Sequence, residues 1–166
     1  RCSIRRWIRD WEPVRLPDGD RAGVLRPGAV CLVTGGLGGI GITAAEDLAA
    51  RVGARLVLLS RTRLPERSAW DAHLAVHGTA ERAGRAIAAI RRIERSGAEV
   101  LVLDGDVTDV ADLRRVREQI LRRFGRLDAI VHSAGVAGGG MAEVKERARA
   151  EAVLAPASTA HLAHQL

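Results

Sequence analysis

Several residue types that enzymes use are missing or nearly missing from this chain of 166 residues. It has no tyrosine and no asparagine, its only lysine is Lys145, and its aromatic residues are one phenylalanine and three tryptophans. Any chemistry in the chain must therefore do without a phenol or an asparagine amide. So few aromatic rings also argue against a stacking platform for single-stranded nucleic acid.

Cysteines and long apolar runs are scarce as well. Cys2 and Cys31 are too few for a disulfide framework, and Cys31 falls inside an apolar run, which predicts a small buried side chain. No run approaches the roughly 20 apolar residues of a membrane span, and no signal-peptide pattern is visible. We therefore expect a cytoplasmic protein without a membrane partner.

The charge balance is basic, with a net charge of +6, and the cations are almost all arginine. A single basic patch would indicate a nucleic-acid partner. Here the arginines are instead spread along predicted helices beside acidic residues. We interpret them as solvated helix faces and expect no nucleic-acid partner.

The most informative stretch is AVCLVTGGLGGIG, residues 29–41, in which an apolar run leads into a glycine-rich turn and then a helical pattern. This is the layout of a dinucleotide-binding βα unit. Glycines permit the tight bend and let a pyrophosphate approach main-chain N–H groups at the helix N-terminus. Both G-x-G-x-x-G and T-G-x-x-x-G-x-G fit; the alternative is a glycine loop without a ligand. The predicted cofactor contacts in the turn are Thr34, Gly35, Gly36, Leu37, Gly38, Gly39, Ile40 and Gly41.

The rest of the chain alternates predicted strands and helices. Strands are expected at 29–33, 55–60, 99–103 and 127–132, with helices after Gly41 and at about 68–76, 83–96, 109–124 and 141–154. Continuous apolar strands suit a parallel sheet that is covered on both faces. The predicted fold class is α/β, a Rossmann-like doubly wound sheet in which right-handed crossovers give the strand order 3-2-1-4.

The sequence also suggests a division of the chain. Residues 1–28 predict a lead-in arm and linker, with a short strand or packed arm near Trp7 to Val14. Residues 29–166 predict the Rossmann domain, which we expect to be truncated after the fourth strand and its following helix. Pro156 is expected to interrupt that helix, and Ser158 to cap another.

The end of the second predicted strand suggests which cofactor is bound. Ser60 and Arg61 lie where NAD-binding domains place an acid on the ribose 2′-hydroxyl. An arginine there suits the 2′-phosphate of NADP(H) instead, because its guanidinium can pair with a phosphate in a bidentate manner. Arg63 is the alternative cation.

The ends of the third and fourth strands complete the predicted site. Asp106 and Val107 follow the third strand, where the carboxylate can accept a hydrogen bond from an adenine amino group or serve as an ordinary turn residue. Ser133, Ala134 and Gly135 follow the fourth strand, where small residues let the cofactor ribose come close.

One spacing typical of metal sites also occurs. His73 and His77 lie four residues apart, which can place both rings on one face of a helix. No third ligand is near them in the sequence, so we expect no metal site.

These motifs resemble the short-chain dehydrogenase/reductases, and more closely the ketoreductase domain of modular polyketide synthases. TGGLGGIG, LSR, DGDVTD and HSAGV occur in that order in the superfamily, while LLSRTRLPERSAWDAHL, WEPV and VLAPAS resemble the ketoreductase domain, over nearly the whole chain. The resemblance implies NADPH-dependent reduction of the β-keto group of a polyketide to a hydroxyl. It also implies partners: the remaining synthase domains, including an acyl carrier that tethers the polyketide.

The resemblance implies that this chain lacks the catalytic residues. The family's Ser, Tyr and supporting Asn are expected beyond Leu166, and Ala157 stands where the family's LAPK stretch has lysine. We therefore predict that no residue of this chain is catalytic. The alternatives are a non-catalytic structural reductase-like domain, which Ala157 favours, and another NADP-dependent member of the superfamily.

Overall fold

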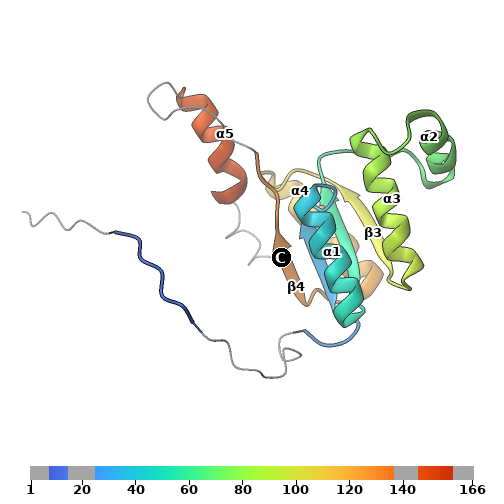
Figure 1. Cartoon of the computed structure of the whole chain (residues 1–166), viewed down its shortest axis with the longest axis horizontal. Coiled ribbons are helices and arrows are strands. Elements are labelled where there is room, and N and C mark those ends of the chain that lie inside the picture. The colour runs from blue at the N-terminus through green and yellow to red at the C-terminus, as the bar shows by residue number, and fades with distance from the viewer. Residues whose placement is uncertain (1–7, 15–24, 137–145, 159–166) are drawn as a thin grey trace, which may run out of the picture.

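The computed structural model describes residues 8–14, 25–136 and 146–158 (Figure 1). Its parallel sheet comprises β1 (Val30–Thr34), β2 (Arg55–Ser60), β3 (Val100–Asp104) and β4 (Ala129–His132) in the order β3-β2-β1-β4. The predicted α/β class and strand order are therefore confirmed. The largest difference in a strand's start is at β4, which begins at Ala129 rather than Leu127.

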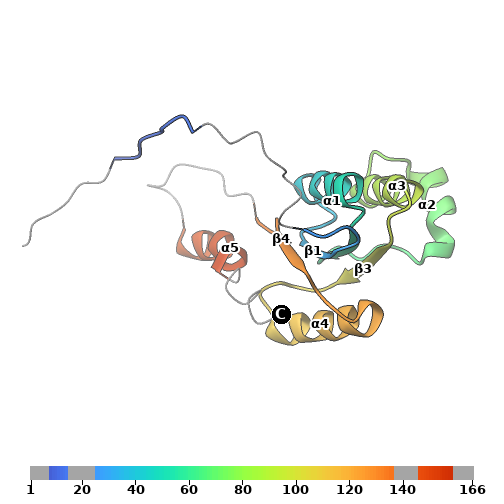
Figure 2. The ribbon, with the colours of Figure 1, turned by 90° about the horizontal axis from the view of Figure 1, so that it is seen from below.

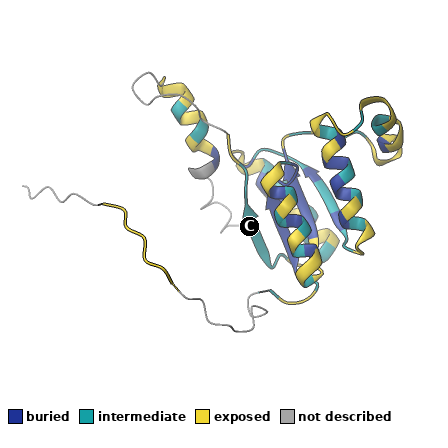
Figure 3. Cartoon of the chain, in the orientation of Figure 1, coloured by how far each residue is buried: buried dark blue, intermediate teal, exposed yellow. Residues whose placement is uncertain are grey.

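The two central strands are buried because helices cover both faces of the sheet (Figures 2 and 3). Alternate side chains of each strand enter two apolar clusters. The clusters include Val33, Leu58 and Ile90 on one face and Leu32, Val57 and Ile120 on the other. Figure 2 shows α1 (Gly39–Val52) and α3 (Arg82–Arg95) on the first face and α4 (Val110–Phe124) on the second.

A short excursion connects β2 to α3. It contains a 3₁₀ turn, η2 (Arg67–Ala69), and α2 (Trp70–His77). Trp70 anchors it: the side chain is buried in the core, and the indole N–H donates to the carbonyl of Pro65 at 2.9 Å. The predicted helix at about 68–76 is thus present, with a 3₁₀ start.

Helix α1 begins at Gly39, earlier than the predicted start after Gly41. The first residues of a helix need no intrahelical partner for their N–H groups, so glycines there cost less than in the interior. The buried stripe consists of Gly41, Ala45 and Ala49. Ile42 and Val52, which lie at helical spacing from this stripe, are only half-buried.

Residues 8–14 differ from the prediction. They form neither helix nor strand, and the side chains of Ile8, Trp11 and Val14 are 80, 81 and 77% exposed. The predicted strand or packed arm is therefore wrong for these residues, because the described chain offers them no surface to pack against. Trp7 lies outside the described residues.

Helix α5 (Arg147–Ser158) runs through Pro156, which was predicted to interrupt it. The proline lies in the last turn, so its missing N–H removes only the bond to the carbonyl of Ala152. Ser158 is the last residue of this helix, while residues 141–145 and the helix predicted to follow Ser158 lie outside the described part. None of the helices in the described ranges is long and apolar enough to cross a bilayer.

Asp128 ties the start of β4 to the start of β1. Its Oδ2 accepts the N–H of Val30 at 2.8 Å and lies 2.9 Å from Nε of Arg126, while Oδ1 lies 3.2 Å from Nη2 of Arg26. These contacts, the Val30 hydrogen bond first, hold the pKa of the Asp128 carboxyl below its ordinary value. The side chain is only 15% exposed, so solvent screens these bonds weakly.

The substitution Asp128→Asn should therefore destabilise the fold at pH 7 by about 1.5–3 kcal/mol, the usual worth of a hydrogen bond to a charged group. Because the folded-state pKa is lowered, this contribution is complete above the ordinary aspartate pKa of about 3.9. It is lost as the pH falls through the folded-state pKa. Urea unfolding of the unchanged chain and of the variant checks this: their free energies of unfolding should differ less at about pH 3 than at pH 7.

Asp47→Asn is the matched control. Asp47 pairs with Arg51 on the exposed face of α1, and such surface pairs contribute about 0.5 kcal/mol or less. A loss for Asp128→Asn no larger than the control's, or one independent of pH, would contradict the assignment.

Candidate cofactor site

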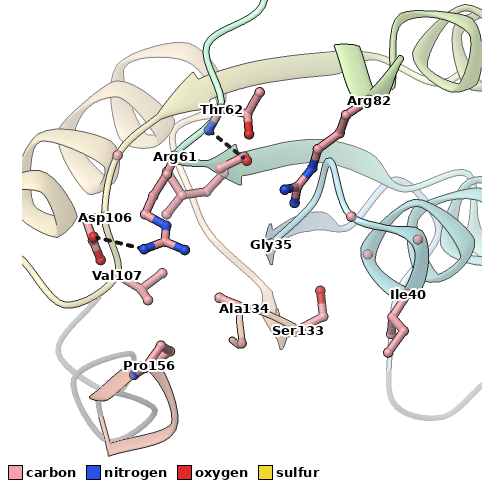
Figure 4. A pocket seen from close by; sticks show the side chains of 17 residues that line it. Gly35, Ile40, Arg61, Thr62, Arg82, Asp106, Val107, Ser133, Ala134 and Pro156 are labelled. Carbon is pink, nitrogen blue, oxygen red and sulfur yellow. Dashed lines mark hydrogen bonds and ion pairs between the residues drawn. The ribbon is translucent and has the colours of Figure 1, made fainter. Parts of the chain in front are cut away.

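A pocket of about 230 Å³ opens where the carboxyl ends of the four described strands meet the N-terminus of α1 (Figure 4). Parallel strands place their ends along one edge, so the loops that follow them converge. The lining residues are Gly35, Gly38, Gly39, Ile40, Gly41, Leu59, Ser60, Arg61, Thr62, Arg82, Gly105, Asp106, Val107, Ser133, Ala134, Gly135 and Pro156.

Most residues predicted from the sequence line this pocket. Thr34, Gly36 and Leu37 do not, because they are buried. Sequence reasoning missed Leu59, Thr62, Gly105, Arg82 and Pro156. The first three adjoin predicted residues, but Arg82 and Pro156 come from distant helices, and no motif marks them.

At three glycines of the turn, other backbone segments lie too close for a side chain to fit. Gly35 has φ +67°, and a Cβ there would lie 2.7 Å from the carbonyl oxygen of Ser133. A Cβ on Gly36 would lie 2.8 Å from the carbonyl oxygen of Val33, and one on Gly41 would first meet the carbonyl oxygen of Gly35, within the turn itself. A side chain at any of them would force the turn out of its present conformation.

Gly39 differs from these three glycines, because a Cβ there would meet no atom within 4 Å. It is exposed, lines the pocket and is the first residue of α1. The N-cap Gly38 provides no side-chain hydrogen bond, and the first turn contains no acidic residue. The first N–H groups of α1 therefore present a partial positive charge to open space, which is the usual arrangement for binding an anion.

Arg61 and Asp106 form a loose pair across the pocket, with Nη1 3.9 Å from Oδ2 (Figure 4). Asp106 Oδ1 accepts from the N–H and the hydroxyl of Thr108 at 2.8 and 2.7 Å. These bonds, the backbone bond first, lower the pKa of Asp106, so the carboxyl is ionised at neutral pH. The turn role considered for Asp106 is therefore present, and its Oδ2 still faces Arg61.

Arg63, the alternative cation, does not line the pocket. Its Nε and Nη2 lie 3.1 and 3.0 Å from Oδ2 of Asp104, at the end of β3. Of the two arginines considered from the sequence, only Arg61 is therefore placed to meet a pocket ligand.

Helix α4 holds the loop that follows β3. Asp112 Oδ2 accepts the N–H of Asp106 at 2.8 Å, and Arg115 Nη2 donates to the carbonyl of Asp104 at 2.6 Å and to Asp112 Oδ1 at 2.8 Å. Arg115 is the main reason that the pKa of Asp112 is lowered. The position of Asp106 is thus set by an ionic pair on α4.

Both ring nitrogens of His132 are engaged within the protein. Nδ1 lies 2.8 Å from Oγ1 of Thr34, and Nε2 lies 3.0 Å from the carbonyl oxygen of Pro156. A carbonyl only accepts, so in the neutral ring Nε2 donates and Nδ1 accepts from the threonine hydroxyl. Ser133 donates its hydroxyl to the carbonyl of Thr34 at 2.6 Å. Neither side chain has a proton free for a pocket ligand.

The histidine pair has a neighbour that its spacing did not reveal. Nδ1 of His77 lies 3.3 Å from Oε1 of Glu81, and Nε2 of His73 lies 3.8 Å from Oε2. These residues do not line the pocket. Within the described ranges, no group of three His, Cys, Asp or Glu side chains is arranged to hold a metal ion.

The fold and pocket define the class of protein: a Rossmann-like domain of the short-chain dehydrogenase/reductase type. An N-terminal ketoreductase from the macrolactin assembly line superposes with a TM-score of 0.66 at 26% identity, over 85% of this chain and 25% of that one. A metagenomic short-chain oxidoreductase in complex with NADP gives 0.62 at 26% identity, over 84% of this chain and 55% of that one.

The model of the KR domain family matches residues 29–165, and the chain belongs to that family. It is 36% identical over 142 residues to 5-methyl-1-naphthoate synthase of Streptomyces sahachiroi, covering 85% of this chain and 8% of the synthase. It is 35% identical over 132 residues to 6-methylsalicylic acid synthase of Penicillium expansum, covering 79% of this chain and 7% of that synthase. A polyketide synthase of Bacillus subtilis, PksN, is 26% identical over 132 residues, which cover 79% of this chain and 2% of PksN. The chain thus matches only a small part of each relative.

Two glycine substitutions test the geometry of the turn. Gly36→Ala should destabilise the fold by about 1–3 kcal/mol, because its Cβ would overlap the backbone of β1 and β2. Gly39→Ala should leave stability unchanged or raise it slightly, because alanine favours the helix and meets no protein atom there. Thermal and urea unfolding of the two variants measures this contrast, and equal losses would show that the turn is packed differently.

Proposed function

We propose that residues 29–165 are the NADPH-binding part of a polyketide synthase ketoreductase. With the rest of the protein, this part reduces the β-keto group of a carrier-tethered polyketide to a hydroxyl. The observation that carries the choice of cofactor is Arg61, a cation at the end of β2 that lines the pocket where an NAD-binding domain has an acid. The family membership and the polyketide synthases among the relatives support the reaction class.

The pocket residues fit this cofactor. The open space at Gly39 and the uncapped N-terminus of α1 suit a pyrophosphate. Arg61 suits the 2′-phosphate, and the ionised Asp106 can accept from the adenine amino group, next to Val107. The remaining assignments are Gly35, Gly38, Ile40 and Gly41 around the pyrophosphate, Ser60 beside the 2′-phosphate, and Ser133, Ala134 and Gly135 at the ribose. Thr34, Gly36 and Leu37 are buried and contribute by packing the turn against the sheet.

This chain supplies binding and orientation, while the proton comes from elsewhere in the protein. Bound NADPH supplies the hydride for ketone reduction, and the carbonyl oxygen needs a positioned proton donor. His132 and Ser133 are both engaged in internal hydrogen bonds, and the sequence contains no tyrosine. The division of the chain into a lead-in at 1–28 and a Rossmann domain from 29 remains part of this proposal.

A second function is favoured by one residue. Ala157 stands where the resemblance places a lysine, which suits a non-catalytic, structural ketoreductase-like domain of a synthase module. The complete protein distinguishes the two: reduction of a tethered β-keto substrate with NADPH supports the catalytic function, and its absence despite NADPH binding supports the structural one.

Replacing Arg61 should change which cofactor is preferred. Arg61→Gln should weaken NADPH binding by about 1.5–3 kcal/mol, the worth of a charge-assisted hydrogen bond, and leave NADH binding nearly unchanged. Arg63→Gln, a matched loss of charge two residues away, should change neither affinity, because Arg63 pairs with Asp104 outside the pocket. Fluorescence titration of both cofactors measures this. Equal losses for NADPH and NADH would refute the role of Arg61.

The chain of 166 residues should bind NADPH without oxidising it in the presence of a simple ketone such as a decalone. Loss of a positioned general acid typically costs about 10²–10⁴-fold in rate. A complete ketoreductase serves as the positive control for NADPH absorbance. Turnover that disappears in Gly39→Asp, which places a carboxylate in the pyrophosphate space, would show that the chain contains a proton donor that we have missed.

A further inference from the structure

We infer that Arg82, at the start of α3, is a second cation that recognises the 2′-phosphate of NADP(H) together with Arg61. This inference rests on the proposed function, because it deepens the assignment of the same pocket. It adds the start of α3 to the nucleotide site, although no motif there indicates binding.

The position of Arg82 carries the inference. It is the first residue of α3 and lines the pocket with Arg61. Figure 4 shows its guanidinium reaching from α3 toward the space between Thr62 and Gly35, while Arg61 turns toward Asp106. In the described part of the chain, Arg82 has no hydrogen bond or ion pair. It is therefore available for a ligand.

The charge of the pocket fits a phosphate. Arg61, Arg82 and Asp106 are the charged side chains among the described residues that line it, so cations outnumber anions there. The positive end of α1 adds to this surplus. A phosphate monoester carries about −1.5 to −2 charges at neutral pH. It can satisfy two guanidinium groups, whereas the 2′-hydroxyl of NAD(H) brings no charge.

The turn before α3 is built to hold Arg82 in place. Gly84 approaches the carbonyl oxygen of Gly78 too closely for any side chain, and Nη1 of Arg85 donates to the carbonyl of Ala80. Glu81, the residue next to Arg82, directs its carboxylate to His77 at 3.3 Å and does not line the pocket. The nearest acid in the sequence therefore does not neutralise Arg82.

Calorimetric titration with NADP⁺ and NAD⁺ tests the inference on the chain and on Arg82→Gln, Arg61→Gln and the double variant. Arg114→Gln is the matched control: Arg114 is exposed on α4, lies outside the pocket and has no polar partner within the described ranges. Thermal unfolding confirms that each variant is folded. Arg82→Gln should weaken NADP⁺ binding about tenfold or more and NAD⁺ binding by less than about twofold, and the double variant should lose most of the preference for NADP⁺.

The outcomes separate this inference from the proposed function. If Arg82→Gln behaves like Arg114→Gln while Arg61→Gln still weakens NADP⁺, the role of Arg82 is wrong and the NADP(H) assignment stands. If Arg82→Gln weakens both nucleotides equally, Arg82 acts on a group they share, and the inference is also wrong. A chain that binds neither nucleotide, or both equally well, would overturn the proposed function and this inference together.

Discussion

The site depends on direct contact between backbones where the β1–α1 turn meets the ends of β2 and β4. At Gly35 and Gly36 no side chain fits between the turn and the neighbouring strands, and at Gly41 none fits against the backbone of the turn itself. The sheet therefore sets the position of the turn, and the turn sets that of the α1 N-terminus. Among the glycines at 35–41 only Gly39 faces open space, so this motif contains residues required for packing and one that leaves room for a ligand.

The charged groups of the site surround this backbone contact. The partial positive charge at α1 lies at the centre of the site, and Arg61 lies at its rim with the ionised Asp106 opposite. Asp106 is held through its N–H by Asp112, which Arg115 keeps ionised from α4. The N-terminus of α1 from one helical layer and side chains of α4 from the other thus meet at one edge of the sheet. This explains why the pocket can be polar although the adjoining strand residues are among the most buried in the chain.

Sequence patterns predicted the sheet well because burial and chain direction leave few alternatives. The continuous apolar run at β2 requires cover on both faces, and right-handed crossovers then leave β4 beside β1. The sequence patterns were less informative about features that depend on contacts between distant parts of the chain. Pro156 ends no helix because it falls in a last turn, and the side chain of Trp11 remains 81% exposed. Arg82 reaches the pocket because α3 packs beside α1 on the same face of the sheet, and no local motif marks that contact.

The side-chain hydrogen bonds that join β1 to β4 have a consequence for the order of folding. Asp128 and Val30 are 98 residues apart, as are Thr34 and His132, whereas β1 and β2 are joined through α1 alone. Closing a longer loop costs more chain entropy, so the β1–β2 unit is expected to assemble first and β4 to dock late. Stopped-flow measurements should then find that removing one of these β1–β4 hydrogen bonds mainly accelerates unfolding and hardly slows folding. A large decrease in the folding rate would mean that β4 already belongs to the folding nucleus.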